Sequence, residues 1–187
     1  MPSNSRNDEF ALLRAAMVDN QLRPQGITDP LILEAMGSVR REMFVPEAAR
    51  TLAYSDRSIP LGDGRSMMPP AALGLLLQAL EPSPGERALI VEAASGYAAE
   101  LLRAMGVAVE PGAPFDLILI DGAVDQVPEA IIAQLAMGGR LATAIADHGV
   151  TRLVVGGKSS GGFGLRSIGD AAVPLLPGFE RRQAFVF

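Results

Sequence analysis

The first eighty residues carry apolar side chains mainly at the spacing of α-helices. Apolar residues recur every three or four positions in two runs: Phe10, Leu13 and Met17, then Leu31, Ile32 and Met36. Asp29-Pro30 precedes the second run and is typical of a helix start, because Asp accepts a hydrogen bond from a free backbone N–H and proline suits the first helical position. Residues 55–70 are rich in Gly, Pro and Asp, which indicates a loop, and residues 71–80 resume a helix.

The pattern changes after residue 85. Short apolar runs at 88–91, 115–120, 140–145 and 153–155 are separated by helical stretches near 96–105 and 128–135. This alternation is typical of an α/β sheet that is mostly parallel. The glycine-rich residues 156–162 lie between two extended runs and predict a C-terminal antiparallel hairpin. We expect a single domain over 1–187, with a helical N-terminal lobe (1–80) and an α/β core (81–187).

The amino-acid composition excludes several kinds of binding and catalytic site. Hydrophobic residues make up 49% of the 187, which is enough for a core, and the net charge of -5 argues against a broad nucleic-acid-binding face. The absence of cysteine and the single histidine, His148, exclude disulfides, thiolate nucleophiles and multi-histidine metal sites, so we expect no metal. The apolar stretch 71–80 is too short to span a bilayer, so we expect a cytoplasmic protein without membrane contact.

Several segments, in order along the chain, resemble one enzyme family. They are residues 17–23 (MVDNQLR), 26–30 (GITDP), 32–36 (ILEAM), 41–46 (REMFVP), 53–56 (AYSD), 62–65 (GDGR), 115–118 (FDLI) and 134–141 (QLAMGGRL). Together they closely resemble protein-L-isoaspartate O-methyltransferases. The resemblance implies a Rossmann-like fold in which S-adenosylmethionine (SAM) lies across the carboxyl ends of the strands and the carboxylate of isoaspartate is methylated. The fold expected here is a reduced version of that α/β methyltransferase fold.

The glycine-rich cofactor turn departs from the family pattern. In the family, the first strand ends in an acid, followed by three alternating glycines and an aromatic residue. Aligned without a gap, Ile90 replaces the acid, Glu92 and Ala94 replace two glycines, and Gly96-Tyr97 remain. Aligned with a two-residue deletion, Glu92 becomes the acid and the loop is short. We expect a weakened turn in which Glu92 faces the carboxylate of the cofactor.

A second departure is a deletion. Only residues 111–114 separate 107–110 from the strand at 115, where the family has a further helix and strand. A parallel crossover needs at least ~10–12 residues, so Glu110 is not expected where the family's ribose-binding acid lies. The loss makes 88–91 an edge strand, which we expect to be covered by 107–114, by a second copy of the chain or by a distinct partner.

The resemblance also implies site residues, all conditional on a retained site. For the cofactor they are Glu92, Ser95, Gly96, Tyr97, Asp121 and Gly122; for the substrate carboxylate they are Gly64, Arg65 and Ser66. Arg65 is the natural partner of an anion. Met68 stands where most members have a serine, and we expect Met67 and Met68 to be packing residues. No catalytic residue is assigned, because methyl transfer depends on alignment more than on acid–base chemistry.

Three functions remain open. The first is a family member with impaired or lost SAM-dependent methyl transfer that acts by binding a protein or peptide, with a homodimer or heteromer formed through the exposed sheet edge. The second is an active carboxyl methyltransferase that uses SAM in a rearranged pocket. The third is a binding module for another small molecule. Residues 156–159 (GGKS) suggest a hairpin rather than a nucleotide loop, and His148 suggests a turn residue.

Overall fold

The computed structural model describes residues 3–92 and 95–179, and its N-terminal lobe is helical as predicted. The lobe contains α1 (Ser3–Met17), a π-helical turn η1 (Val18–Leu22), the 3-10 turns η2 (Arg23–Gln25), η3 (Arg41–Met43) and η4 (Glu47–Leu52), α2 (Pro30–Ser38) and α3 (Pro70–Leu80). The Asp29 carboxylate accepts a hydrogen bond from the backbone N–H of Leu31 at 2.8 Å, so the predicted helix start is confirmed. None of the helices described has the length and apolar character needed to cross a membrane.

A short hairpin replaces the loop that the sequence predicts before α3. Strands β1 (Ile59–Gly62) and β2 (Arg65–Met67) pair antiparallel. The turn between them uses three consecutive left-handed residues, Gly62, Asp63 and Gly64, which is why this segment is rich in glycine and aspartate. Strands this short show too little alternation to be recognised in the sequence.

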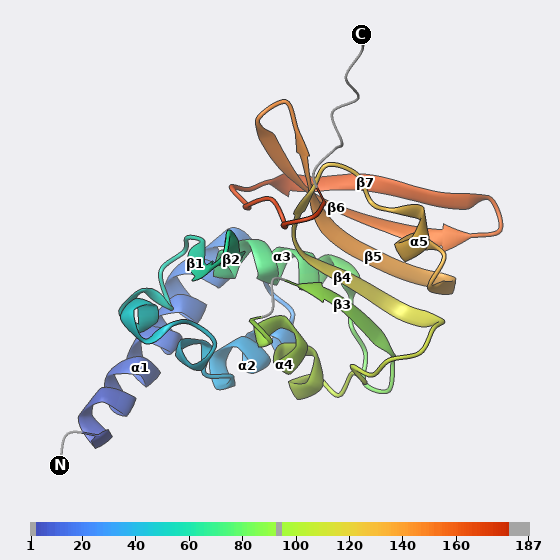
Figure 1. Cartoon of the computed structure of the whole chain (residues 1–187). Helices are drawn as coiled ribbons and strands as arrows, with labels where there is room; N and C mark the ends of the chain where they lie inside the picture. Colours follow the sequence, from blue (N-terminus) through green and yellow to red (C-terminus); the bar gives the residue numbers. More distant parts are fainter. Residues whose placement is uncertain (1–2, 93–94, 180–187) are drawn as a thin grey trace, which may run out of the picture.

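The C-terminal part is a five-stranded sheet in the order β3-β4-β5-β6-β7 (Figure 1). Its elements are β3 (Ala88–Glu92), α4 (Tyr97–Ala104), β4 (Phe115–Val124), α5 (Glu129–Ile132), β5 (Leu135–Asp147), β6 (Val150–Ser159) and β7 (Gly162–Asp170). β3, β4 and β5 are parallel, and β6 and β7 add antiparallel. The expected fold class, including the C-terminal hairpin at the glycine-rich segment, is therefore confirmed.

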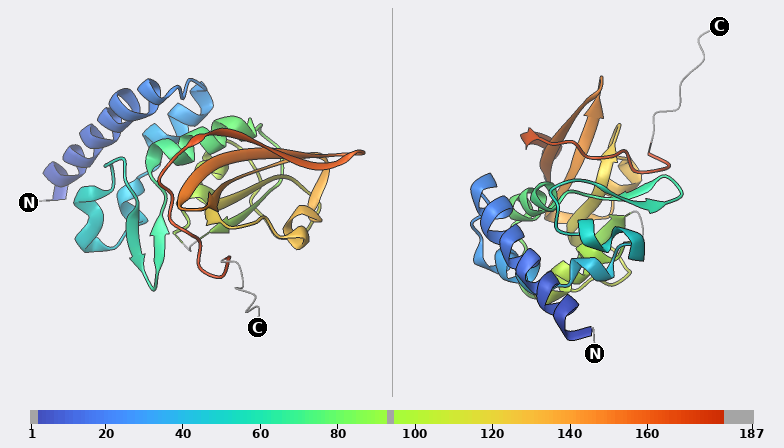
Figure 2. Two further views of the ribbon diagram at one scale, coloured as in Figure 1. Left: turned by 90° about the horizontal axis from the view of Figure 1, so that it is seen from above. Right: turned by 90° about the vertical axis from the view of Figure 1, so that its left-hand side faces the viewer.

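Alternation along β4 separates the two faces of the sheet. Leu117 and Leu119 point into the core that the sheet shares with the N-terminal lobe, α3 and α4. Ile118 and Ile120 point the other way, into a smaller cluster covered by α5 and by Leu176. Figure 2 shows the helices of the lobe gathered on one side of the sheet. Because of this alternation, the residue at position 121 belongs to the face toward the lobe.

β3 is the edge strand, as the deletion predicts. Ala108 pairs with its first residues: the Ala88 N–H donates to the Ala108 carbonyl, and the Ala108 N–H donates to the Glu86 carbonyl, both at 2.8 Å. Of the three expected covers, the segment 107–114 therefore covers the beginning of the edge. Glu110 is exposed and follows Ala108 by two residues, so it lies near the amino-terminal end of β3, away from the Glu92 end.

Candidate functional site

Two acids lie toward the carboxyl ends of the neighbouring parallel strands: Glu92 is the last residue of β3, and Asp121 lies three residues before the end of β4. Glu92 and Asp121 are register partners across the strand pair, so their side chains lie on the same face of the sheet. Alternation places that face toward the N-terminal lobe, where Ile90 and Leu119 contribute to the shared core. We call Glu92 and Asp121 the acid pair. It lies at the carboxyl edge of the sheet, where ligands bind in open α/β folds.

The side chain of Glu92, the last residue of β3, lies at the start of helix α4. Its carboxylate accepts hydrogen bonds from the Gly96 N–H at 3.0 Å and from the Ser95 hydroxyl at 3.3 Å, while the Ser95 Oγ accepts from the Tyr97 N–H at 3.2 Å. Gly96 adopts a left-handed conformation (φ 78°) that favours glycine. A helix N-terminus stabilises an anion, and the protein's own carboxylate already lies there. The prediction for Ala94 falls outside the described residues.

Arg41 is the buried cation of the site. It lies in η3 with no exposed surface, and its guanidinium donates to the carbonyls of Ala53 at 2.8 Å and Met68 at 2.5 Å. Its Cζ atom is 4.8 Å from the centre of the Tyr97 ring, and its charge also interacts with that of Asp121. Arg41 thus joins the segment before α3, the start of α4 and the end of β4. Sequence reasoning missed it as a site residue, because no pattern distinguishes a buried arginine from an exposed one.

Asp121 has a strongly perturbed acidity. Burial raises its pKa to about 7, the nearby Glu92 charge contributes to the rise, and the Arg41 charge opposes the change. The residue is 3% exposed, and its Oδ1 atom has no hydrogen-bond partner among the described residues. A buried, unpaired carboxyl at a ligand edge is typical of a group that a ligand completes.

Two further buried atoms around Arg41 lack a hydrogen bond of good geometry within the described chain. They are Nη1 of Arg41 itself and the hydroxyl of Tyr97, which is fully buried. The Arg41 guanidinium and the Tyr97 hydroxyl nevertheless interact with each other, so each compensates part of the burial of the other. Arg41, Tyr97 and Asp121 therefore outline a polar centre between the lobe and the sheet.

Gly122 has a packing role. A Cβ atom at this position would lie 3.0 Å from Cβ and 3.2 Å from Cδ1 of Leu176. The C-terminal segment crosses here because the Ala123 N–H donates to the Pro174 carbonyl and the Leu176 N–H donates to the Ala123 carbonyl. The structure thus places Leu176 over the residue that the resemblance implied for the cofactor.

We expect Gly122→Ala to lower the free energy of unfolding by about 1–3 kcal/mol, because Leu176 must move from its packed position. Urea denaturation of the variant measures this loss. Gly164→Ala is the matched control, since a Cβ there meets no atom within 4 Å. An unchanged stability of Gly122→Ala would contradict the packing role.

The substrate-loop residues lie in the hairpin β1–β2, whose second strand lies against β4. Gly64 is in the turn, and Arg65 and Ser66 begin β2, both partly exposed. Arg65 pairs with Asp63 at 3.1 Å, and its Nε atom is buried without a partner in the described chain. Arg65 therefore has a donor left for an anionic ligand. Met67 and Met68 are buried in the core, so the packing interpretation of these two residues is confirmed.

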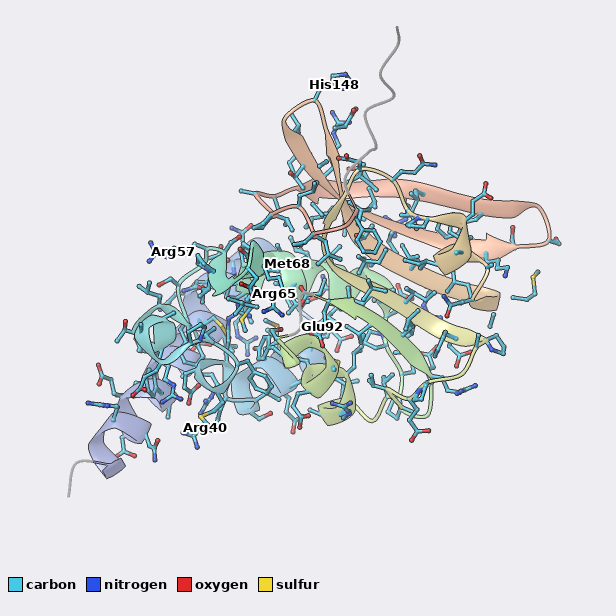
Figure 3. The ribbon with its side chains drawn as sticks, viewed as in Figure 1. Arg40, Arg57, Arg65, Met68, Glu92 and His148 are labelled. Carbon is cyan, nitrogen blue, oxygen red and sulfur yellow. The ribbon has the colours of Figure 1, made fainter. Side chains whose placement is uncertain are left out.

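Figure 3 shows Arg65, Met68 and Glu92 where the hairpin meets the sheet, and His148 at the far tip of the β5–β6 turn. His148 has a left-handed backbone and an exposed side chain, as expected of a turn residue. The predicted hairpin is present, but residues 156–159 lie in its strand β6 and the turn follows at residues 160–161. Lys158 in β6 donates to the Leu135 carbonyl at 2.8 Å. No group of three or more metal-ligating side chains occurs in the described residues.

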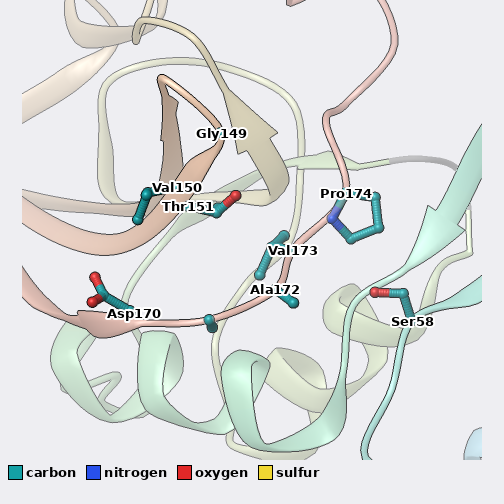
Figure 4. Close-up of a pocket in the computed structure, with 9 residues that line it drawn as sticks. Ser58, Gly149, Val150, Thr151, Asp170, Ala172, Val173 and Pro174 are labelled. Atoms are coloured by element: carbon teal, nitrogen blue, oxygen red, sulfur yellow. The ribbon is translucent and has the colours of Figure 1, made fainter.

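A separate cavity of about 750 Å³ lies between the residues before β1, the β5–β6 turn and the segment after β7 (Figure 4). Ser58, Thr151, Asp170 and Pro174 are among its lining residues. It shares no lining residue with the acid pair or with the substrate loop. The backbone of Pro174 nevertheless connects it to the end of β4, through the hydrogen bond from Ala123.

The model of one protein family, protein-L-isoaspartate(D-aspartate) O-methyltransferase (PCMT), matches residues 14–109 and 104–168. The chain belongs to the PCMT family. A Methylorubrum populi protein-L-isoaspartate O-methyltransferase is 36% identical, with 88% of this chain and 95% of that protein covered. A Rhodopseudomonas palustris protein-L-isoaspartate O-methyltransferase 1 is 33% identical, with 82% of this chain and 78% of that protein covered.

Solved PCMT structures share the fold. A Plasmodium falciparum protein described as a PCMT, in complex with S-adenosyl-L-homocysteine (SAH), superposes with a TM-score of 0.73 and 17% identity, covering 87% of this chain and 97% of that one. A second protein-L-isoaspartate O-methyltransferase gives a TM-score of 0.72 at 18% identity, covering 88% of this chain and 66% of that one. At this identity the likeness shows the common architecture.

The comparisons also locate the deletion. The alignment to the M. populi protein spans 202 positions but covers about 165 of the 187 residues here, so about 37 positions of the relative face gaps. The PCMT model matches in two pieces that meet at residues 104–109, directly before the short connection to β4. The relatives are named as methyltransferases, and nothing in the comparisons indicates lost activity. These findings favour the active alternative over the impaired one.

Proposed function

We propose that this protein is a SAM-dependent carboxyl methyltransferase that acts on isoaspartyl residues of proteins or peptides, with a cofactor site rearranged around the acid pair. The observation that supports the proposal is the arrangement of two segments, implied by the resemblance, around the paired strands β3 and β4. The hairpin with Arg65 lies against β4, and the helix start at Gly96 follows β3. The names of the relatives supply the reaction and the substrate class.

The described residues fit the charged end of the cofactor. SAM supplies an activated methyl group on a sulfonium, beside an ammonium and a carboxylate. The unpaired Oδ1 of Asp121 and the carboxylate of Glu92 suit the two cations, and the remaining N–H groups of the α4 start suit the anion. The ribose has no acid from a second strand, because Glu110 lies at the other end of β3. We therefore expect a lower affinity than a complete turn would give.

For the substrate, the chain supplies position and charge. Arg65 offers its partly exposed guanidinium to the isoaspartyl carboxylate, and the partly exposed Ser66 lies next to it on β2. The buried Met68 excludes water from the lobe side of the site. A carboxylate needs no deprotonation at neutral pH to act as a nucleophile, so the groups that orient it contribute most to the rate.

Calorimetric titration with SAM and SAH, followed by methyl transfer to an isoaspartyl peptide with the aspartyl peptide as control, tests this function. We expect micromolar binding and selective methylation.

Arg65→Gln should raise KM for the peptide about tenfold and leave SAM affinity unchanged, because it removes a charged partner of the substrate alone. Arg57→Gln, an exposed arginine before β1, is the control. Absence of binding heat and of any thermal shift at millimolar ligand would contradict the proposal.

A second candidate is binding of a protein or peptide without methyl transfer, as a monomer or through the edge of β3. Two observations favour it: the Glu92 carboxylate already lies at the α4 start, and β3 is an edge strand in a chain shorter than its aligned relative. It shares the first proposal's partner class and differs in predicting no SAM binding. The same titration therefore separates the two.

A further inference from the structure

The acid pair is an unusual feature of a binding site, because nothing in the described chain neutralises it fully. Glu92 has the Gly96 N–H and the Ser95 hydroxyl as partners. Among the described residues, Asp121 has no hydrogen-bond partner for Oδ1, and Arg41, whose charge interacts with it, donates its hydrogen bonds to the carbonyls of Ala53 and Met68. The pair therefore leaves an excess of negative charge on the lobe side of the sheet.

The burial of Asp121 makes this excess costly unless a ligand compensates it. A carboxyl 3% exposed with a free oxygen destabilises the protein whenever it is ionised. An acid that lowers stability, and whose Oδ1 atom has no hydrogen-bond partner among the described residues, is better explained by binding than by folding. The complementary group is a compact cation that reaches both carboxylates.

We propose that Glu92 and Asp121 form a subsite for a cationic group and that this subsite makes the protein select the sulfonium of SAM over the neutral thioether of SAH. The proposal rests on the proposed function, because it assumes that these ligands enter the site. It also explains why an acid stands at position 92, where the family pattern has a glycine. The Glu92 carboxylate attracts the sulfonium charge, which SAM carries and SAH lacks. The product lacks that charge and leaves more readily.

The comparison of SAM with SAH isolates this effect. Both ligands carry the same adenosine, ammonium and carboxylate groups, so any repulsion between Glu92 and the ligand carboxylate is common to both. They differ at the sulfur, where SAM carries one positive charge and one methyl group more. Sinefungin, which carries an ammonium near the same position and no transferable methyl, separates charge from methyl contact.

The experiment is calorimetric titration of the full chain with the three ligands at pH 8. We expect SAM and sinefungin to bind at least about tenfold more tightly than SAH, since a unit charge near a buried acid contributes more than a tenfold factor at an effective dielectric constant of about 20. Asp121→Asn and Glu92→Gln each bring the SAM-to-SAH ratio toward one. Both substitutions keep the side-chain shape, and the amide introduced by Glu92→Gln retains an oxygen for the Gly96 N–H.

Glu100→Gln is the matched control. It removes one acid from the exposed face of the same helix, α4, and should leave the ratio unchanged. Equal or tighter binding of SAH by the wild type, or an unchanged ratio in Asp121→Asn, overturns the subsite. Thermal melting of each variant without ligand verifies that it is folded.

The failure of the proposed function has a different signature. If none of the three nucleosides binds, the proposed function fails, and trimethylsulfonium chloride then tests the subsite alone. With carbon-13 labelled aspartate, the NMR titration of the Asp121 carboxyl follows its pKa with and without this cation. A lower pKa with trimethylsulfonium than with the same concentration of sodium supports the subsite, and an unchanged pKa overturns it.

Discussion

Asp121→Asn is expected to stabilise the protein above pH 7 by up to about 4 kcal/mol. The pKa of Asp121 rises from an ordinary value of 3.8 to about 7 in the folded state, chiefly through burial and secondly through the Glu92 charge, with Arg41 opposing. Each pKa unit corresponds to about 1.4 kcal/mol, so folding is penalised by roughly that amount per unit once the carboxyl is ionised. Asparagine keeps the shape and removes the charge.

The pH dependence has a definite sign. Well below pH 3.8 the carboxyl is protonated in both the folded and the unfolded chain, so Asp121 causes no penalty. Between pH 4 and 7 the unfolded chain loses the proton first, so wild-type stability falls relative to Asp121→Asn, and above pH 7 the full difference is present. Urea denaturation of both proteins from pH 4.5 to 8.5 measures the gap. A gap that stays constant with pH would contradict the raised pKa.

Arg41→Met is expected to destabilise the protein by about 3–5 kcal/mol. The substitution removes the Arg41 donor from the buried carbonyls of Ala53 and Met68, and it removes a cation that interacts with Asp121. The aliphatic part of methionine restores some of the packing on Tyr97 but none of the hydrogen bonds. The loss of stability should therefore be among the largest that a single change in this chain can cause.

Urea denaturation at pH 7 measures this effect, with Arg103→Met as the control. Arg103 forms an exposed ion pair with Glu100 at 3.5 Å, and its loss should change stability by less than about 0.5 kcal/mol. A destabilisation by Arg41→Met no larger than that of the control would show that the guanidinium contributes nothing net to folding.

Local signals explain what the sequence predicts well. The Asp29-Pro30 start of α2 and the runs that become β3 and β4 depend on neighbouring residues alone, and the structure contains them. The strands are longer than expected, since β5 runs from Leu135 to Asp147, because pairing with β4 and β6 extends a strand beyond its apolar centre. The sequence does not predict the hairpin β1–β2, because its strands are too short to show an alternation of apolar and polar residues.

The site was only partly predictable for a related reason. The family resemblance implied Glu92 and Asp121, and both lie in apolar strands whose parallel pairing makes them neighbours. Their partner Arg41 comes from a separate 3-10 turn, and nothing in its local sequence shows that it is buried. Gly122 followed the same strand signal but lies beneath Leu176, a residue more than fifty positions later. Contacts over such separations depend on the tertiary fold.

The edge position of β3 shows how the family fold persists in a shorter chain. A strand–helix–strand unit at the margin of a sheet touches the remaining strands along one side only, so its removal leaves every pairing from β3 to β7 in place. The connection at residues 110–114 is then held by Arg87, whose guanidinium donates hydrogen bonds to the carbonyls of Gly112 and Pro114. In this architecture, the margin of the sheet is where evolution can change the length of the chain without redesigning the core.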